Sequence, residues 1–242
     1  MTALLTVDGV GKRFRGLLAV DNVSFRVAQG SIFAVIGPNG AGKTTLFNVI
    51  AGAFAPDRGS IAFAGERIDG LAPDEICRRG IGRTFQLVRP FPALSVEDNV
   101  IIGAMLRRHD PTVARRRAHE VLVRLDLFGK RHQPASALTL ADRKRLEVAR
   151  ALATDPKLLL LDEVMAGLRP AETDRMVSVL TELNRESGLT ILLIEHVMRA
   201  VMALAARVLV LHHGAAIAEG PPEAVVREPA VVQSYLGAEA VE

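Results

Sequence analysis

Short, continuous apolar runs of strand length recur along the chain and alternate with segments of helical spacing. The runs are SIFAVIG at 31–37, KLLLLDE at 157–163 and LTILLIE at 189–195. Helical patterns follow them at 43–51, after Pro170 and at 197–205. A continuous apolar run is typical of a strand that is buried on both faces. The alternation therefore predicts an α/β fold with a parallel central sheet.

The two ends of the chain and its middle depart from this alternation. Residues 4–27 cluster β-formers and GSIAFAG at 59–65 lies between glycines, which favours antiparallel strands near the N-terminus. The stretch RVLVLHHGAAIAEG, 207–220, predicts a hairpin that turns at His213. Helical patterns dominate 95–153, and we interpret this block as a subdomain inserted into the sheet domain.

The bulk composition narrows the class of protein. The 242 residues, 49% of them hydrophobic, suit one large domain or one domain with an inserted subdomain. A formal net charge of +3 does not by itself make a nucleic-acid surface, and a single cysteine excludes an intrachain disulfide. No apolar run approaches the ~20 residues that span a bilayer, and the N-terminus lacks a signal-peptide pattern. We therefore expect a soluble chain that reaches a membrane only through a partner.

The strongest chemical signal is GPNGAGKT at 37–44, which matches G-x-x-x-x-G-K-[ST] between a predicted strand and a predicted helix. Its glycines let backbone N–H groups turn inward around phosphate. Lys43 is placed to reach the β- and γ-phosphates, and the Thr44 hydroxyl to hold Mg²⁺. A glycine-rich turn that matches by chance is the alternative, but the strand and helix on either side favour a nucleotide site.

A second signal lies at the end of the apolar run LLLLDE. Asp162 stands where P-loop enzymes place a Mg²⁺-bound carboxylate. Glu163 is adjacent and has the chemistry to orient or deprotonate an attacking water. An acidic strand end without a function is the alternative, and the phosphate loop makes it the weaker interpretation.

The stretch LTLAD, 138–142, reads as the start of a helix. Thr139 suits the N-cap, and Asp142 suits the positive end of the helix three residues later. A helix N-terminus also binds anions, so this stretch is either a simple cap or a phosphate site.

Taken in order, these motifs resemble the ATP-binding subunits of ABC transporters over nearly all of the chain. The resemblance implies that Phe14 stacks on adenine, that Gln86 in GRTFQ senses Mg²⁺ and the γ-phosphate, and that His196 in LLIEH contacts the γ-phosphate. A single Phe on a strand is also typical of a core. The implied ATP site comprises Phe14, Gly37, Pro38, Asn39, Gly40, Ala41, Gly42, Lys43, Thr44, Thr45 and Gln86. The implied catalytic residues are Lys43, Glu163 and His196, and the implied Mg²⁺ ligands are Thr44, Gln86 and Asp162.

The resemblance also implies a division of the chain. A single ABC ATPase domain covers 1–237, with a P-loop NTPase core of mixed or parallel sheet and an N-terminal antiparallel β-subdomain. This core comprises 1–94 and 155–219, the inserted helical subdomain 95–154, a short C-terminal helical extension 220–237 and a tail 238–242. AGLRPAE, 166–172, matches the loop that crosses the dimer interface in the family, and Val164 replaces the proline that commonly follows Asp-Glu.

LTLAD falls where the family carries its signature, usually Leu-Ser-Gly-Gly-Gln, which closes over the ATP of the opposite subunit. Thr139 keeps a hydroxyl, Leu140 and Ala141 replace both glycines, and Asp142 replaces the glutamine. A methyl group and a negative charge weaken such a site, although the basic residues 143–145 offset the charge. Because each site combines one chain's phosphate loop with the other chain's signature, we hypothesise a heterodimer with a related, glycine-bearing ATPase.

Three strings are similar to the branched-chain amino acid importer group: GIGRTFQLVRPFPALSVEDNV (80–100), RKRLEVARAL (143–152) and GPPEAVVREPAVVQSYLG (220–237). The resemblance implies two polytopic permease subunits, a second, non-identical ATPase, and indirectly an external solute-binding protein. It places the chain at the cytoplasmic face of the inner membrane as a peripheral subunit. ATPases of urea or short-amide import and of lipopolysaccharide export remain alternatives.

Other classes fit less well. Soluble ABC ATPases usually have a coiled-coil insertion or tandem ATPase domains, and this chain has neither. The basic run at 107–120 is interrupted by acidic residues and lacks aromatics, so a solvated helix face is favoured and no nucleic-acid partner is expected. A P-loop kinase is disfavoured because Glu163 and His196 suit water as the nucleophile.

Overall fold

Two β-sheets organise the computed structural model, which describes residues 2–85 and 90–239. A four-stranded antiparallel sheet has the order β2-β1-β4-β5, with β1 at Ala3–Phe14, β2 at Leu17–Ala28, β4 at Arg58–Phe63 and β5 at Glu66–Arg67. A six-stranded sheet has the order β10-β9-β3-β8-β7-β6. Its strands are β3 (Ile32–Ile36), β6 (Ile81–Arg83), β7 (Leu158–Asp162), β8 (Thr190–Ile194), β9 (Arg207–His212) and β10 (Ala215–Gly220). All neighbours in it are parallel except β9 and β10, which confirms the predicted hairpin.

The helices lie between these strands. They are α1 (Lys43–Ile50), α2 (Pro73–Arg79), α3 (Val96–Ala104), α4 (Pro111–Arg124), α5 (Leu140–Leu152), α6 (Pro170–Ser187), α7 (Met198–Leu204), α8 (Pro222–Val225) and α9 (Pro229–Glu239). Short 3₁₀ turns occur at Phe128–Lys130 and Ala135–Ala137. The described residues between β6 and β7 form helices and turns, as the helical patterns predict, with one isolated antiparallel bridge between Ser95 and Pro134. No helix among the described residues is long and apolar enough to cross a bilayer.

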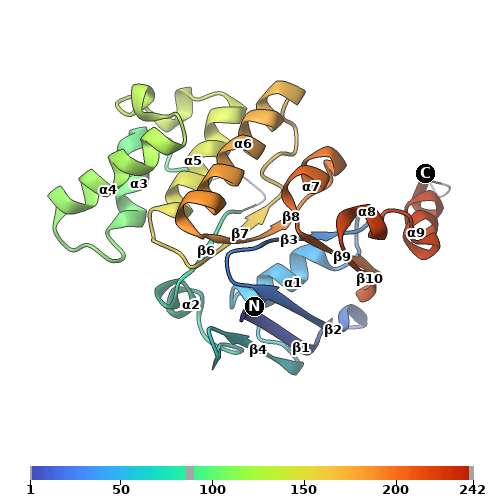
Figure 1. The fold of residues 1–242 in the computed structure, drawn as a ribbon. Helices are drawn as coiled ribbons and strands as arrows, with labels where there is room; N and C mark the ends of the chain where they lie inside the picture. The colour runs from blue at the N-terminus through green and yellow to red at the C-terminus, as the bar shows by residue number, and fades with distance from the viewer. Residues whose placement is uncertain (1, 86–89, 240–242) are drawn as a thin grey trace.

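The central sheet is covered on both faces, which explains its continuous apolar runs. In β7, Leu159 and Leu161 join one hydrophobic cluster, whereas Leu158 and Leu160 join another. Figure 1 shows α5, α6 and α7 on one side of this sheet, and α1 with the antiparallel sheet on the other. Because both faces are buried, alternation of polar and apolar residues is absent from these strands.

The order of the parallel strands decides which loops meet. β8 lies between β3 and β7, so the three loops at their carboxyl ends are neighbours at one edge of the sheet. The pairs Val35–Ile194 and Asp162–Ile194 align the strand ends. The edge therefore gathers the phosphate loop, the Asp162-Glu163 pair and the segment that starts at Glu195.

Candidate functional site

The phosphate loop connects β3 to α1 with glycines in conformations that other residues rarely adopt. Gly37 has φ 145° and Gly42, the N-cap of α1, has φ 99°. A Cβ on Gly37 would lie 2.1 Å from the Leu211 carbonyl oxygen, and one on Gly42 would lie 2.2 Å from that of Ala19. Both positions therefore require glycine for conformation and for close packing.

Lys43 is held at the loop by its own backbone. Its side chain is buried, and Nζ donates hydrogen bonds to the carbonyl oxygens of Gly37, at 2.7 Å, and Pro38, at 3.0 Å. Burial lowers the pKa of Lys43, while Glu163 and Asp162 oppose that shift. The ammonium group is thus desolvated in advance, which strengthens its attraction for a polyanion.

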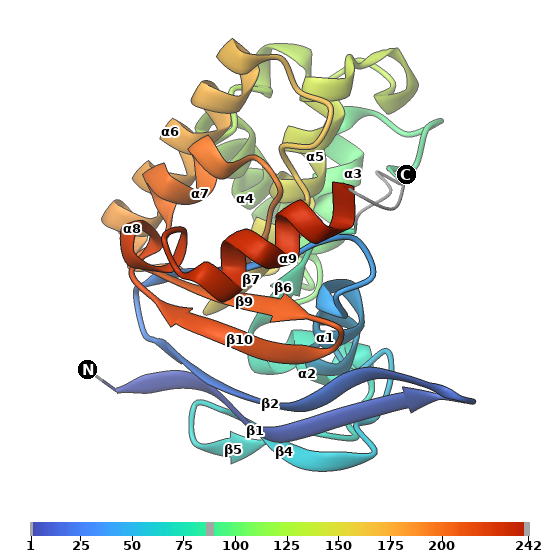
Figure 2. The ribbon, with the colours of Figure 1, turned by 90° about the vertical axis from the view of Figure 1, so that its right-hand side faces the viewer.

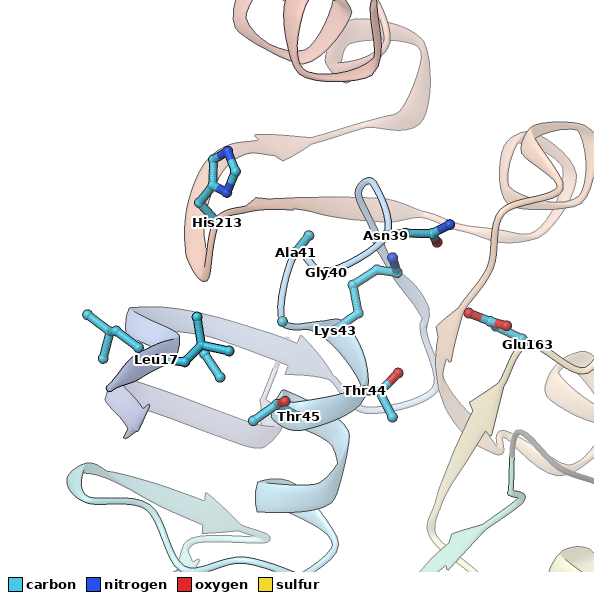
Figure 3. Close-up of a pocket in the computed structure, with 12 residues that line it drawn as sticks. Leu17, Asn39, Gly40, Ala41, Lys43, Thr44, Thr45, Glu163 and His213 are labelled. Carbon is cyan, nitrogen blue, oxygen red and sulfur yellow. The ribbon is translucent and has the colours of Figure 1, made fainter. Parts of the chain in front are cut away.

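A cavity of about 400 Å³ opens over this loop (Figure 3). Its lining brings together Leu17, Leu18, Ala19, residues 39–45, Glu163 and His213. In Figure 3 the Glu163 carboxylate faces Lys43 and Thr44 across the cavity. The cavity therefore presents phosphate-binding groups on one side and a carboxylate on the other.

Asp162 ends β7 with an environment that suits a divalent cation. Its side chain is fully buried, and neither carboxylate oxygen has a hydrogen-bond partner among the described residues. Arg83 lies 3.6 Å from Oδ2. Burial raises the pKa of Asp162, and the Arg83 charge opposes this. Arg83 supplies one positive charge, but neither carboxylate oxygen is hydrogen-bonded, so Asp162 is chemically suited to the predicted Mg²⁺ ligand.

Glu163 and His196, which the resemblance implies as catalytic residues, are in direct contact. Glu163 Oε1 and His196 Nε2 are 2.6 Å apart, although the two residues come from the loops after β7 and β8. The backbone of Glu163 is in the left-handed region with φ 51°, which is unfavourable for a side chain other than glycine. Such a strained residue at a cavity is typical of functional sites.

LTLAD is a capped helix start, as predicted. The Thr139 hydroxyl accepts the Asp142 N–H at 3.2 Å and donates to Asp142 Oδ2 at 2.9 Å. Asp142 is buried and ion-paired with Lys130 and Arg145.

The structure shows which groups balance the charge of Asp142. Of the basic residues at 143–145, Arg145 forms an ion pair with Asp142. Lys130 forms a second ion pair with the same carboxylate, which is buried. Lys144 instead donates to the Glu163 carbonyl oxygen at 2.8 Å. The charge of Asp142 is therefore balanced by Lys130 and Arg145 within the chain.

The structure leaves the predicted roles of Gln86 and Phe14 untested. Gln86 lies outside the described residues. Phe14 is 37% exposed and packs edge-on against Phe54, with ring centroids 5.0 Å apart, and it is absent from the cavity lining. Its role in stacking on adenine stays a prediction.

Several residues at the site were not predicted. Leu17, Leu18 and Ala19 line the cavity from β2, His213 lines it from the β9–β10 turn, and the Gly214 N–H donates to the Ala41 carbonyl at 3.0 Å. Tyr235 of α9 hydrogen-bonds the Gly37 backbone, and burial raises its pKa. Figure 2 shows α9 beside β9 and β10. Only the turn propensity of His213-Gly214 is visible in the sequence, and nothing in it indicates these contacts.

Comparison with known proteins gives the class to which this fold and site belong. The family described as "ABC transporter" matches residues 20–166, and the family described as "Branched-chain amino acid ATP-binding cassette transporter" matches residues 217–241. The chain therefore belongs to the ABC transporter ATP-binding family, and its activity is ATP hydrolysis coupled to transport.

The relatives narrow the resemblance further. The chain is 39% identical to the high-affinity branched-chain amino acid transport ATP-binding protein LivG of Salmonella typhimurium, covering 97% of this chain and 98% of LivG. It is 34% identical to the lipopolysaccharide export system ATP-binding protein LptB of Acidithiobacillus ferridurans, with 98% of each chain covered. A crystal structure of an ABC transporter cassette in its ADP conformation aligns with TM-score 0.89 and 31% identity, covering 98% of this chain and 100% of the cassette.

Proposed function

We propose that this chain is the ATPase subunit of an importer for branched-chain or related amino acids. The observation that carries the ATPase chemistry is the position of Glu163, which lines one cavity with the phosphate loop and contacts His196. The match of the C-terminal extension and the LivG relatives support the amino acid substrate. The resemblance to LptB makes lipopolysaccharide export the competing assignment.

The roles of the residues follow from their positions. Lys43 and the loop N–H groups bind the phosphates, and Glu163 orients water and accepts its proton during in-line attack on the γ-phosphate. His196 holds the Glu163 carboxylate and contacts the γ-phosphate. Asp162, Thr44 and Gln86 would hold Mg²⁺, which neutralises charge on the phosphates when bound.

The proposed assembly is a transporter with two permease subunits and a second, non-identical ATPase, at the cytoplasmic face of the inner membrane. The family supports permease partners, and the departures at Leu140 and Ala141 support the unlike ATPase. The solute-binding protein acts on the far side of the membrane and does not contact this chain.

The proposal is tested by uptake into vesicles that contain the complex purified with its permease subunits. We expect ATP-dependent uptake of leucine, isoleucine or valine that is lost in Glu163→Gln. That variant should keep its affinity for ATP while its turnover falls by about 10²–10⁴-fold, because only the base is lost. Glu182→Gln, an exposed change on α6, is the matched control. Uptake of urea or short amides in place of these amino acids would overturn the substrate assignment. Lipopolysaccharide release without uptake of any solute would overturn it as well.

A further inference from the structure

The catalytic loop after β7 has a strained start and lacks a common source of rigidity. Glu163 has φ 51°, and the next residue is Val164, where the family commonly has proline. Proline fixes its own φ and reduces the freedom of the unfolded chain, and valine does neither to the same degree. The strained conformation of Glu163 must therefore be maintained by other contacts.

Backbone contacts to two distant segments hold the loop. The Glu163 N–H donates to the Ile194 carbonyl of β8 at 3.0 Å, and the Glu163 carbonyl accepts from Lys144 Nζ at 2.8 Å. Lys144 belongs to α5, the helix that starts with LTLAD, and is only 6% exposed. A buried ammonium group on a carbonyl oxygen forms a charge-assisted hydrogen bond, which is stronger than a neutral one.

Glu195 holds the other end of the same loop. Its Oε1 accepts the Met165 N–H at 2.9 Å, and the side chain is 1% exposed. Its second oxygen, Oε2, has no hydrogen-bond partner among the described residues. Burial lowers the pKa of Lys144, and Glu195 and Glu163 are the two largest charges opposing that shift. Lys144 and Glu195 are thus two buried ionisable residues on either side of one short segment.

We infer that Lys144 and Glu195 are positioning residues that fix the Glu163 loop in its reactive conformation. They act through the Glu163 carbonyl and the Met165 N–H, and neither lines the nucleotide cavity. Because Lys144 lies in the helix that carries the signature, the contact also links that helix to the catalytic loop of the same subunit. This inference rests on the proposed role of Glu163.

The test compares Lys144→Met and Glu195→Met with Glu195→Gln in the assembled transporter. The Met side chains remove the anchoring groups, whereas the Gln amide oxygen still accepts the Met165 N–H. We expect each Met variant to lower kcat by about 10- to 100-fold with unchanged ATP affinity, because a misplaced general base loses rate and not binding. Glu195→Gln should keep most of the parent kcat. The double Met variant should lose little more than the worse single one.

Controls separate the possible failures. Lys157→Met, an exposed change at the start of the β7 segment, should leave kcat unchanged. If Glu163→Gln stops turnover while both Met variants keep the parent kcat, the positioning inference is wrong and the role of Glu163 stands. If Glu163→Gln itself turns over normally, the proposed base is wrong. If circular dichroism shows that Glu195→Met does not fold, Lys144→Met alone decides the question. Equal losses of kcat and ATP affinity in Lys144→Met would overturn the inference.

Discussion

The Lys43 side chain is buried at the phosphate loop, and its position determines how much ATP affinity a substitution removes. Its ammonium donates to two loop carbonyls, so the side chain is already ordered at the cavity. We expect Lys43→Ala to weaken ATP binding by roughly 10- to 100-fold, since a hydrogen bond to a charged group contributes about 1.5–3 kcal/mol. Binding of a fluorescent ATP analogue measures this. Retained affinity in the alanine variant would contradict the assignment, and Lys157→Ala serves as the exposed control.

Glu195 makes the stability of the fold depend on pH. Burial raises its pKa from 4.5 to about 7. Between these values the unfolded carboxyl has lost its proton while the folded one retains it, so the free energy of unfolding falls as pH rises through this window. Above the folded pKa, this shift lowers the free energy of unfolding by about 3 kcal/mol relative to its value at low pH.

Glu195→Gln cannot ionise, so we expect its stability relative to the parent to increase between about pH 5 and about pH 8. Urea denaturation of the parent and of Glu195→Gln at both pH values gives the difference in their free energies of unfolding at each pH. A constant difference across this range would show that Glu195 titrates at its ordinary pKa. Glu182→Gln, an exposed change, should show no such trend.

At the scale of the element, α5 starts with a complete cap, and at its first turn Leu140 and Ala141 stand where the family usually has the two signature glycines. Thr139 and Asp142 satisfy each other, so the Thr139 hydroxyl is already used within its own subunit. Leu140 is 42% exposed at the first turn. The helix is therefore well formed, and its N-terminus lacks the glycines that admit a facing γ-phosphate.

Restoring one glycine tests this directly. We expect Ala141→Gly to increase ATP turnover of the chain when it is the only ATPase present, because the methyl group no longer separates backbone and phosphate. Glycine within a helix costs about 1 kcal/mol of stability, so a small fall in melting temperature should accompany the gain. Phosphate release at saturating ATP measures the effect, and Ala151→Gly at the other end of α5 is the control. An unchanged rate would mean that Ala141 does not limit the facing site.

For the whole molecule, the departures in the signature predict that this chain hydrolyses ATP efficiently only in a dimer with an unlike ATPase. The phosphate loop, Asp162, Glu163 and His196 of this chain are all present, whereas in the proposed dimer its signature would serve the partner's nucleotide. We expect weak turnover from the purified chain alone and a more than additive rate when a glycine-bearing partner ATPase is added. Titration of one protein into the other, followed by phosphate release, checks this. Full, cooperative activity of the chain alone that is unchanged by Ala141→Gly would exclude the heterodimer.

The fold also joins the C-terminal extension to the nucleotide site. Tyr235 of α9 packs against the hydrophobic cluster that includes Ile36 at the end of β3, and the β9–β10 turn contacts Ala41. Because α9 also packs against β10, the segment that marks the branched-chain group is not a loose appendage. Nothing in the periodicity of residues 220–237 indicates this contact, because it depends on where the central sheet places α9.

The sequence by itself determined the features that depend on local order. The phosphate loop, the Asp162-Glu163 strand end, the hairpin at His213 and the Thr139 cap follow from spacing and from the conformations that each residue allows. The short helix α2, the three-residue β6 and the two-residue β5 escape such reasoning, since segments of this length carry little periodicity.

Only the tertiary structure decided which distant side chains meet. Lys144 is one of three adjacent basic residues, and the packing of α5 against the β7 end directs it to Glu163 while Arg145 pairs with Asp142. Glu195 reads as the end of an apolar strand, yet the placement of β8 beside β7 brings it to Met165. Contacts between residues far apart in the chain depend on sheet order and helix packing, which local patterns do not encode.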